Sequence, residues 1–167
     1  MQVGLDLQSD EAVSKIKEMA LAIDFAMLCT NLSAKPFHAI PMSTKRVDAN
    51  GAIWFLSGCD STHNGNILND SKVELLYSHP GSMRFLIVYG EAIIHMDKKI
   101  LKELYGATDD AWFQGVDDPN ISAIQVVPLD AHYWDTKNNR LISMAKMGIA
   151  AVTGKQPDLA EHGDLKL

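Results

Sequence analysis

The densest group of chemically capable side chains in the sequence is Ser57-Gly58-Cys59-Asp60-Ser61-Thr62-His63-Asn64. It follows an apolar run at 52–56 and leads into a predicted short helix with Asp60 or Ser61 as its cap. Small residues between a strand and a helix N-terminus offer backbone N–H groups and hydroxyls to a phosphate or another anion. The segment lacks the Gly-Lys-Ser/Thr ending of a P-loop, so nucleoside triphosphate hydrolysis is not indicated. An ordinary capped turn is the alternative interpretation.

Neither the cysteines nor the histidines form a catalytic or metal-binding pattern. Cys59 lies four residues before His63, but the adjacent Asp60 carboxylate disfavours a thiolate nucleophile. Cys29 and Cys59 have no CxxC spacing, which excludes a zinc ribbon and is compatible with a reducing compartment. No HxxxH or HxH spacing occurs among the six histidines, so no metal site is predicted: His38, His63, His79, His95, His132 and His162.

The elements that must position the 57–64 group follow from the spacing of apolar residues. Apolar positions three and four apart predict an amphipathic helix over 10–23, and Asp97 to Tyr105, with Gly106 after it, predicts a short second helix. Seven strands are predicted, at 25–30, 37–43, 52–56, 73–77, 84–95, 121–127 and 131–134. Pro128 is expected to separate the last two of them. A weakly helical order over 141–152 precedes a polar tail from Thr153. The three tryptophans, Trp54, Trp112 and Trp134, are typical of core positions.

Length and composition limit the class of protein. With 167 residues, 47% apolar and 22% charged, the chain is expected to fold as one mainly β domain over 1–167 with helices at its edges. Acidic residues number 21 against 15 basic ones, and no basic cluster exceeds two residues, so nucleic acid is not an expected partner. No signal-peptide pattern and no spanning apolar segment is present in the sequence, so a cytoplasmic protein without membrane contact is predicted.

Three stretches in this order, IPMSTKRVDANGAIWFLSGCDS, AWFQGVDDP and AHYWD, resemble the general-stress-protein branch of the pyridoxamine-phosphate-oxidase-like, FMN-binding split-barrel family. The likeness runs from the N-terminal helix through Trp134, and MAKMGIAAVTGKQPDL resembles that branch's helical extension. It implies a six-stranded Greek-key split barrel with N-terminal and peripheral helices. The implied barrel core spans about 10–136, with a C-terminal helical extension and tail over about 137–167. It also implies a homodimer whose cofactor crevice lies between the subunits.

The resemblance also implies a cofactor, FMN with FAD as the other possibility, and the residues around it. The strand from His38 to Ser43 would lie beside the flavin ring, the backbone at 55–58 along the ring edge, and residues 60, 61 and 63 at the phosphate. Trp112 would approach the flavin of the partner subunit. The implied cofactor-binding residues are therefore His38, Ile40, Pro41, Met42, Ser43, Phe55, Leu56, Ser57, Gly58, Asp60, Ser61, His63 and Trp112. No catalytic residue and no metal ligand is implied.

Three positions depart from the family pattern, and all three lose a cation. Ile40 replaces an Arg, Cys59 a frequent basic residue, and His63 the phosphate-binding Lys. The loss of two charge-assisted hydrogen bonds would lower the affinity for FMN by a factor of about 100 to 10,000. A protonated His63, Lys45 or Arg46 could compensate for this loss.

Two functional hypotheses remain, and a third rests only on the absence of recognisable catalytic residues. The first is a flavin-dependent oxidoreductase of unknown substrate, in which the cofactor does the covalent chemistry with an unidentified small-molecule redox partner. The second is a non-enzymatic split-barrel dimer that carries or senses flavin, or binds another ligand. The third is a purely structural interaction protein. Turnover separates the first two hypotheses, because flavin binding alone fits both.

Overall fold

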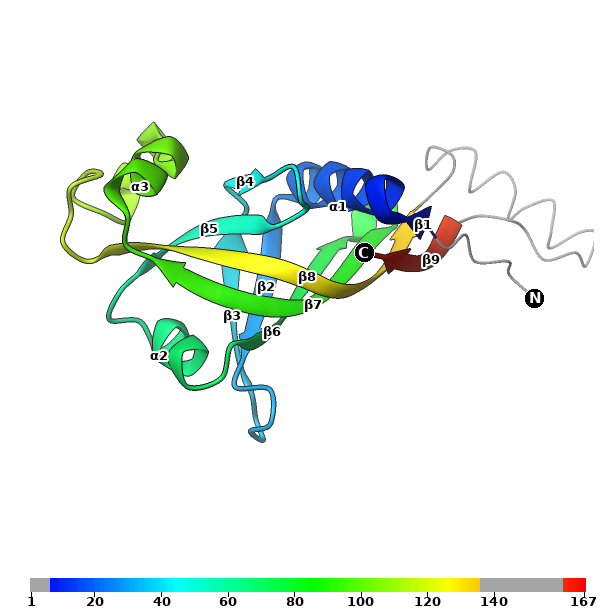
Figure 1. Ribbon diagram of the computed structural model, residues 1–167, viewed down its shortest axis with the longest axis horizontal. Helices are drawn as coiled ribbons and strands as arrows, with labels where there is room; N and C mark the ends of the chain where they lie inside the picture. Colours follow the sequence, from blue (N-terminus) through cyan, green and yellow to red (C-terminus); the bar gives the residue numbers. More distant parts are fainter. Residues whose placement is uncertain (1–6, 136–160) are drawn as a thin grey trace, which may run out of the picture.

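The computed structural model describes residues 7–135 and 161–167, which form one curled, mainly antiparallel β-sheet flanked by helices (Figure 1). This confirms the predicted mainly β class. The strands in the described residues are β1 (Leu7–Gln8), β2 (Phe25–Thr30), β3 (His38–Ser43), β4 (Arg46–Val47), β5 (Ile53–Gly58), β6 (Lys72–His79), β7 (Arg84–His95), β8 (Ile121–Asp135) and β9 (Glu161–Lys166).

The strand order explains why the sheet curls into a half-barrel. The hydrogen-bonded path runs β3-β2-β6-β7-β8, and β5 continues it from β8 with β4 on its outer edge. The link between β3 and β4 brings the two ends of this path together. Thr44 N donates to Asp24 O at 3.0 Å, and Lys45 N donates to Trp54 O at 2.8 Å. The chain therefore steps from the β3 edge to the β5 edge within two residues.

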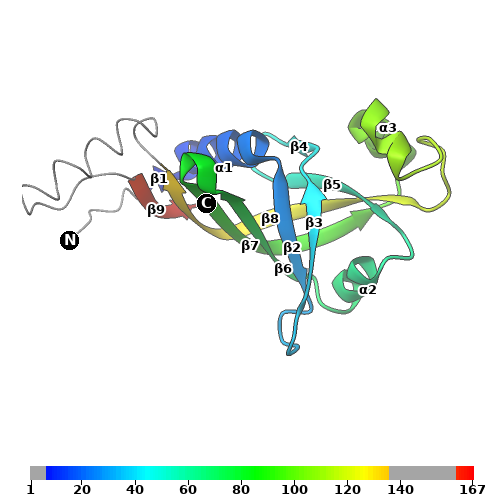
Figure 2. The ribbon, with the colours of Figure 1, turned by 180° about the vertical axis from the view of Figure 1, so that it is seen from behind.

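Three α-helices and two 3₁₀ turns are described. They are α1 (Ser9–Ile23), α2 (Thr62–Asn69), α3 (Lys98–Leu104), η1 (Pro80–Ser82) and η2 (Ala107–Ala111). Seen from the front and from behind, α1 and α3 lie toward opposite ends of the long axis (Figures 1 and 2). Ser61 caps α2 by accepting from Asn64 N, and Asp97 caps α3. The helices predicted at these places are confirmed.

The core lies between α1 and the concave side of the sheet. One face of α1 is buried through Ala12, Ile16, Met19 and Ala20. The largest fully buried side chains are Tyr77, Tyr133 and Phe55. The Tyr77 hydroxyl lies 2.8 Å from Thr44 Oγ1, so this buried phenol has a polar partner. A second cluster around Trp54 and Leu101 joins α3 to the outer side of β5 and β8.

The predicted break at Pro128 is wrong, because β8 runs unbroken from Ile121 to Asp135. On one edge of β8, β5 pairs as far as Val126 and β9 begins at Ala131, so Pro128 lies where no N–H is required. On the other edge, the register with β7 shifts between Tyr89 and Gly90. Gly90 faces this irregularity, and a Cβ there would lie 2.3 Å from Val127 O.

The C-terminal segment differs from its prediction. Residues 161–166 form β9, which pairs with β8 and, in parallel, with β1, where a polar tail was expected. Leu165 is the only strongly apolar residue of this strand and is buried, which is too weak a pattern for detection. The helical extension predicted over 141–152 lies outside the described residues.

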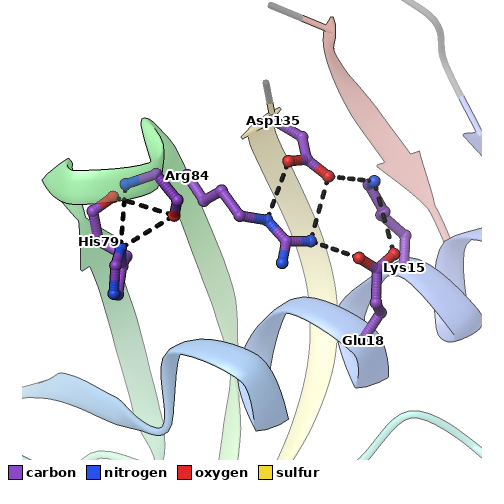
Figure 3. A network of polar contacts seen from close by, with 6 residues as sticks. Lys15, Glu18, His79, Arg84 and Asp135 are labelled. Atoms are coloured by element: carbon purple, nitrogen blue, oxygen red, sulfur yellow. Dashed lines mark hydrogen bonds and ion pairs between the residues drawn. The ribbon is translucent and has the colours of Figure 1, made fainter. Parts of the chain in front are cut away.

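A network of charged side chains fastens α1 to the ends of β7 and β8 (Figure 3). The Asp135 carboxylate accepts from Arg84 Nη2 at 3.1 Å and from Lys15 Nζ at 2.6 Å, and Arg84 Nε lies 2.9 Å from its other oxygen. Glu18 of α1 completes the network by pairing with both Arg84 and Lys15. In the described part of the chain, no helix is both long and apolar enough to cross a membrane.

Candidate functional site

A cavity of about 550 Å³ opens between β3, β5 and the segment around η2. It lies where β3 and β5, at the two ends of the strand path, come together, so residues that are far apart in the sequence line the same cavity. Its lining residues are Asp24, Phe25, Ile40, Pro41, Met42, Ser43, Lys45, Leu56, Ser57, Gly58, His63, Thr108, Asp109, Trp112 and Phe113.

One part of the lining is apolar. Ile40 and Pro41 come from β3, Leu56 from β5, and Trp112 and Phe113 follow η2. Trp112 is 83% exposed, so the expectation of a core tryptophan is wrong at this position. Flat aromatic and aliphatic side chains of this kind suit a planar ligand ring.

The other part of the lining is a network of neutral polar groups at the end of β5. Ser57 Oγ lies 2.5 Å from His63 Nε2 and 2.9 Å from Asn64 Oδ1. Ser61 Oγ lies 3.0 Å from the same imidazole nitrogen. Asn64 donates to Ser122 Oγ at 2.9 Å, and Ser122 donates to Ser57 O at 3.0 Å. The network thereby fixes Ser57 and His63 to both β5 and β8.

His63 is neutral in this environment. Burial, followed by the nearby His38, lowers the pKa of His63 to about 4. The two imidazole rings are stacked with centroids 6.3 Å apart and an interplanar angle of 7°. His38 Nε2 is itself buried without a hydrogen-bond partner. The geometry therefore holds His63 as an uncharged hydrogen-bonding group near neutral pH.

The charged residues of the cavity are paired within the protein. Lys45 Nζ lies 2.6 Å from Asp109 Oδ2, which also accepts from Gly106 N at 2.8 Å. Asp24 Oδ1 accepts from Ser43 Oγ at 2.8 Å. Arg46, the other cation considered from the sequence, pairs with Glu103 at 3.1 Å and does not line the cavity. Lys45 is therefore the only Lys or Arg among the lining residues, all of which are described.

The structure brings most of the residues nominated from the sequence to this cavity. Those that line it are Ile40, Pro41, Met42, Ser43, Leu56, Ser57, Gly58, His63 and Trp112. Ser61 and His38 contact His63 from outside the lining. Phe55 is 0% exposed, and its side chain belongs to the core. Asp60 is exposed and takes no part in the lining.

Several contributors were not found from the sequence. Asp24, Phe25, Thr108, Asp109 and Phe113 line the cavity, and Asn64 with Ser122 supports it. Phe113 follows Trp112 in the AWFQG motif, and this position beside a nominated residue was the signal that could have identified it. The others come together only through the strand order, because no local spacing links Asn64 to Ser122 or Lys45 to Asp109.

Comparison with known proteins agrees with this architecture. A family model described as pyridoxamine 5′-phosphate oxidase like matches residues 11–158. The chain belongs to this family. No curated protein matches the chain. The structure is similar to a protein named general stress protein 26 from Jannaschia sp. CCS1, with a TM-score of 0.78 and 19% identity over 95% of this chain and 99% of that one.

Two further solved structures share the fold. A general stress FMN/FAD binding protein from Xanthomonas citri has a TM-score of 0.66 and 22% identity, covering 77% of this chain and 92% of that chain. A protein related to general stress protein 26 from Clostridium acetobutylicum has a TM-score of 0.65 and 17% identity, covering 78% and 92%. The predicted split-barrel fold and the family resemblance are thus confirmed.

The cavity fits the two ends of FMN differently. The apolar lining of Ile40, Pro41, Leu56 and Trp112 suits the ring system. The polar end offers hydroxyls and a neutral His63, and the Lys45 ammonium is held by Asp109. The residues present therefore match a flavin ring, whereas no unpaired cation among them matches a phosphate dianion.

Proposed function

We propose that this protein binds a flavin in the cavity between β3, β5 and η2. The observation that carries the proposal is the cavity lining itself, with apolar side chains on one part and uncharged hydroxyl and imidazole groups on another. Family membership supports it, as does the FMN/FAD binding stated for the X. citri protein of the same fold. FMN is the cofactor expected from the family, with FAD as the other possibility.

The chain's own residues would bind and orient the ring. Ile40 and Pro41 offer an apolar surface from β3, and Trp112 stands at the opening where it can exclude water from the ring. Backbone groups at Ser57 and Gly58 can meet the polar edge of a flavin, because both line the cavity at the end of β5. A bound flavin supplies hydride or electron transfer, so the protein would be a flavin-dependent oxidoreductase of unknown substrate.

The state of the titratable groups favours the second candidate, a non-enzymatic flavin carrier or sensor. Asp24, Lys45, His63 and Asp109 line the cavity, and each already has a partner inside the protein. A flavoenzyme that used one of these groups as an acid or base would have to break its existing contact or transfer the proton through it. A carrier needs no such group.

We propose a homodimer because the convex face of the sheet carries a row of apolar side chains. Met27 pairs with Pro41 and Leu76, and Leu76 pairs with Ile87, so an apolar row crosses four strands. Met27 is 39% exposed and the neighbouring Phe25 is 59% exposed. Because Phe25 and Pro41 also line the cavity, a second copy on this face would cover its opening.

The oligomeric state is tested by light scattering during size-exclusion chromatography. The protein is expected at the mass of a dimer, and Met27→Lys is expected to shift it toward the monomer because it places a charge in the apolar row. Leu68→Lys is the matched control, since Leu68 is exposed on α2 and outside this row. A monomeric unmodified protein would refute the dimer.

Flavin binding is tested by absorbance spectra of the purified protein before and after adding excess flavin and desalting. Flavin bands that stay with the protein at about one per subunit support the proposal, and complete loss from both samples contradicts it. Anaerobic mixing of the loaded protein with NADH or NADPH then separates the two candidates. Bleaching of the flavin followed by reoxidation with a soluble acceptor indicates an oxidoreductase, and no bleaching indicates a carrier. Cytoplasmic localisation stays a prediction from the sequence.

A further inference from the structure

The polar end of the cavity is built for an uncharged group. We propose that the cavity takes a flavin that ends in a neutral polyol, riboflavin, in preference to its phosphate ester, FMN. This inference rests on the proposed function, because it concerns which flavin the same cavity selects. It is carried by three features of the lining: the position of His63, the pairing of Lys45, and the two carboxylates nearby.

The first feature is the hydrogen-bonding state of His63. Its Nε2 atom lies within hydrogen-bond distance of both Ser57 Oγ and Ser61 Oγ. Both hydroxyls are thus already joined to the imidazole, and Asn64 holds Ser57 from the other side. The stacked His38 ring and the burial of the site disfavour a second proton on His63. The imidazole therefore presents a neutral donor or acceptor rather than a cation.

The second feature is the pairing of Lys45. Its ammonium lies 2.6 Å from Asp109, and both side chains are largely buried, with 16% and 12% of their surfaces exposed. A phosphate could recruit Lys45 only by leaving the Asp109 carboxylate without its partner. Removing one member of a buried ion pair is strongly unfavourable, because the remaining charge is poorly solvated. Lys45 is therefore not free to replace the cations that a phosphate requires.

The third feature is the sign of the remaining charge. Besides Lys45, the charged side chains that line the cavity are the carboxylates of Asp24 and Asp109. With His63 neutral, one cation faces two anions. A phosphate near neutral pH adds about 1.5 to 2 negative charges, so the lining would repel it. The hydroxyls of a ribityl chain carry no charge and can exchange hydrogen bonds with Ser57 and His63, which line the cavity.

The size of the preference follows from the bonds that each tail can make. A phosphate loses its hydration and gains only neutral partners here, whereas a hydroxyl exchanges water for equivalent partners. Riboflavin is therefore expected to bind about tenfold more tightly than FMN, which corresponds to about 1.4 kcal/mol.

The test is a pair of flavin-fluorescence titrations of the full-length protein near neutral pH, one with riboflavin and one with FMN, after bound flavin has been removed. His63→Lys is expected to narrow or reverse the preference, because it places a cation at the polar end. Thr62→Lys is the matched control, since it adds the same charge at the adjacent exposed position outside the lining. His63→Gln keeps the site neutral and is expected to retain the preference for riboflavin.

The outcomes separate this inference from the proposed function. Tighter riboflavin binding that narrows in His63→Lys and persists in Thr62→Lys supports the inference. Equal or tighter FMN binding by the unmodified protein overturns it and leaves flavin binding in place. Failure of both flavins to bind overturns both proposals. If His63→Lys does not fold, the comparison of the two flavins with the unmodified protein and with His63→Gln still decides.

Discussion

Replacement of Asp135 by Asn tests how α1 is held on the barrel. The Asp135 carboxylate lies at the centre of the network in Figure 3, where it meets Arg84 with both oxygens, at 2.9 and 3.1 Å, and Lys15 at 2.6 Å. Its side chain is 14% exposed. An Asn at this position keeps the shape but loses the charge, so Glu18 is the carboxylate of this network that still pairs with Lys15 and Arg84.

The expected loss is larger than for a surface ion pair. Hydrogen bonds to charged groups contribute about 1.5–3 kcal/mol each, and fully buried pairs cost about 3–5 kcal/mol when one member is removed. Because the network is partly exposed and Glu18 retains its contacts, we expect Asp135→Asn to lower the free energy of unfolding by about 2–3 kcal/mol. For a domain of this length, the melting temperature would fall by about 4–12 °C.

Thermal unfolding followed by circular dichroism measures this loss. Asp117→Asn is the matched control, because the pair between Asp117 and Lys98 is 70% and 71% exposed, and little change is expected there. Equal melting temperatures for Asp135→Asn and the unmodified protein would refute the idea that the network fastens α1. So would an equal loss in the Asp117 control.

The pH dependence of the same variant gives an independent check. Burial tends to raise the pKa of Asp135, but hydrogen bonds from Lys15 and Arg84 outweigh it and hold the pKa below its usual range. A depressed carboxyl pKa stabilises the folded state above the unfolded value, near pH 4, and this stabilisation is lost as pH falls through the folded pKa. The stability gap between the unmodified protein and Asp135→Asn should therefore narrow on acidification below about pH 4.

Three further predictions concern the barrel and the support of the cavity. Gly90→Ala should destabilise the protein by about 1–3 kcal/mol in chemical unfolding, because its Cβ would meet Val127 O, whereas Gly65→Ala in α2, where the space is open, should stabilise it by about 0.5–1 kcal/mol. Asn64→Ala should cost about 1–3 kcal/mol in the same assay and weaken flavin binding, because Ser57 and Ser122 lose their shared partner. Tyr77 should stay protonated in alkaline spectrophotometric titration until the protein unfolds, since burial raises its pKa; Tyr77→Phe should therefore remove only the late step.

The parts of the fold with a strong local pattern were predictable. The apolar spacing of 10–23 and the double-faced apolar run at 84–95 gave α1 and β7, because burial imposes those periods on the sequence. Pro128 misled the strand assignment, because its tolerance depends on which partners β8 has at that point. The paired edges of β8 are set by β5 and β9, which the local sequence around Pro128 does not specify.

The candidate site was predictable only where a family motif marked it. Ile40, Pro41 and His63 came from motif positions, and they line the cavity. Phe55 was nominated for its backbone groups, and its side chain is buried in the core. Asp109 carried no signal, because its contact with Lys45 spans 64 residues and depends on the placement of η2.

The neutral character of the polar end arises from the fold rather than from the residue type at position 63. From the sequence, a protonated His63 was a candidate to replace a lost cation. The structure joins the imidazole to Ser57 and Ser61, and Ser57 is held in turn through Asn64 and Ser122. To become a cation, His63 would have to keep its second proton in a buried site beside His38. The buried position in which this network holds the imidazole, beside His38, therefore works against its charge, and ligand choice at this cavity depends on β5 and β8 as much as on His63.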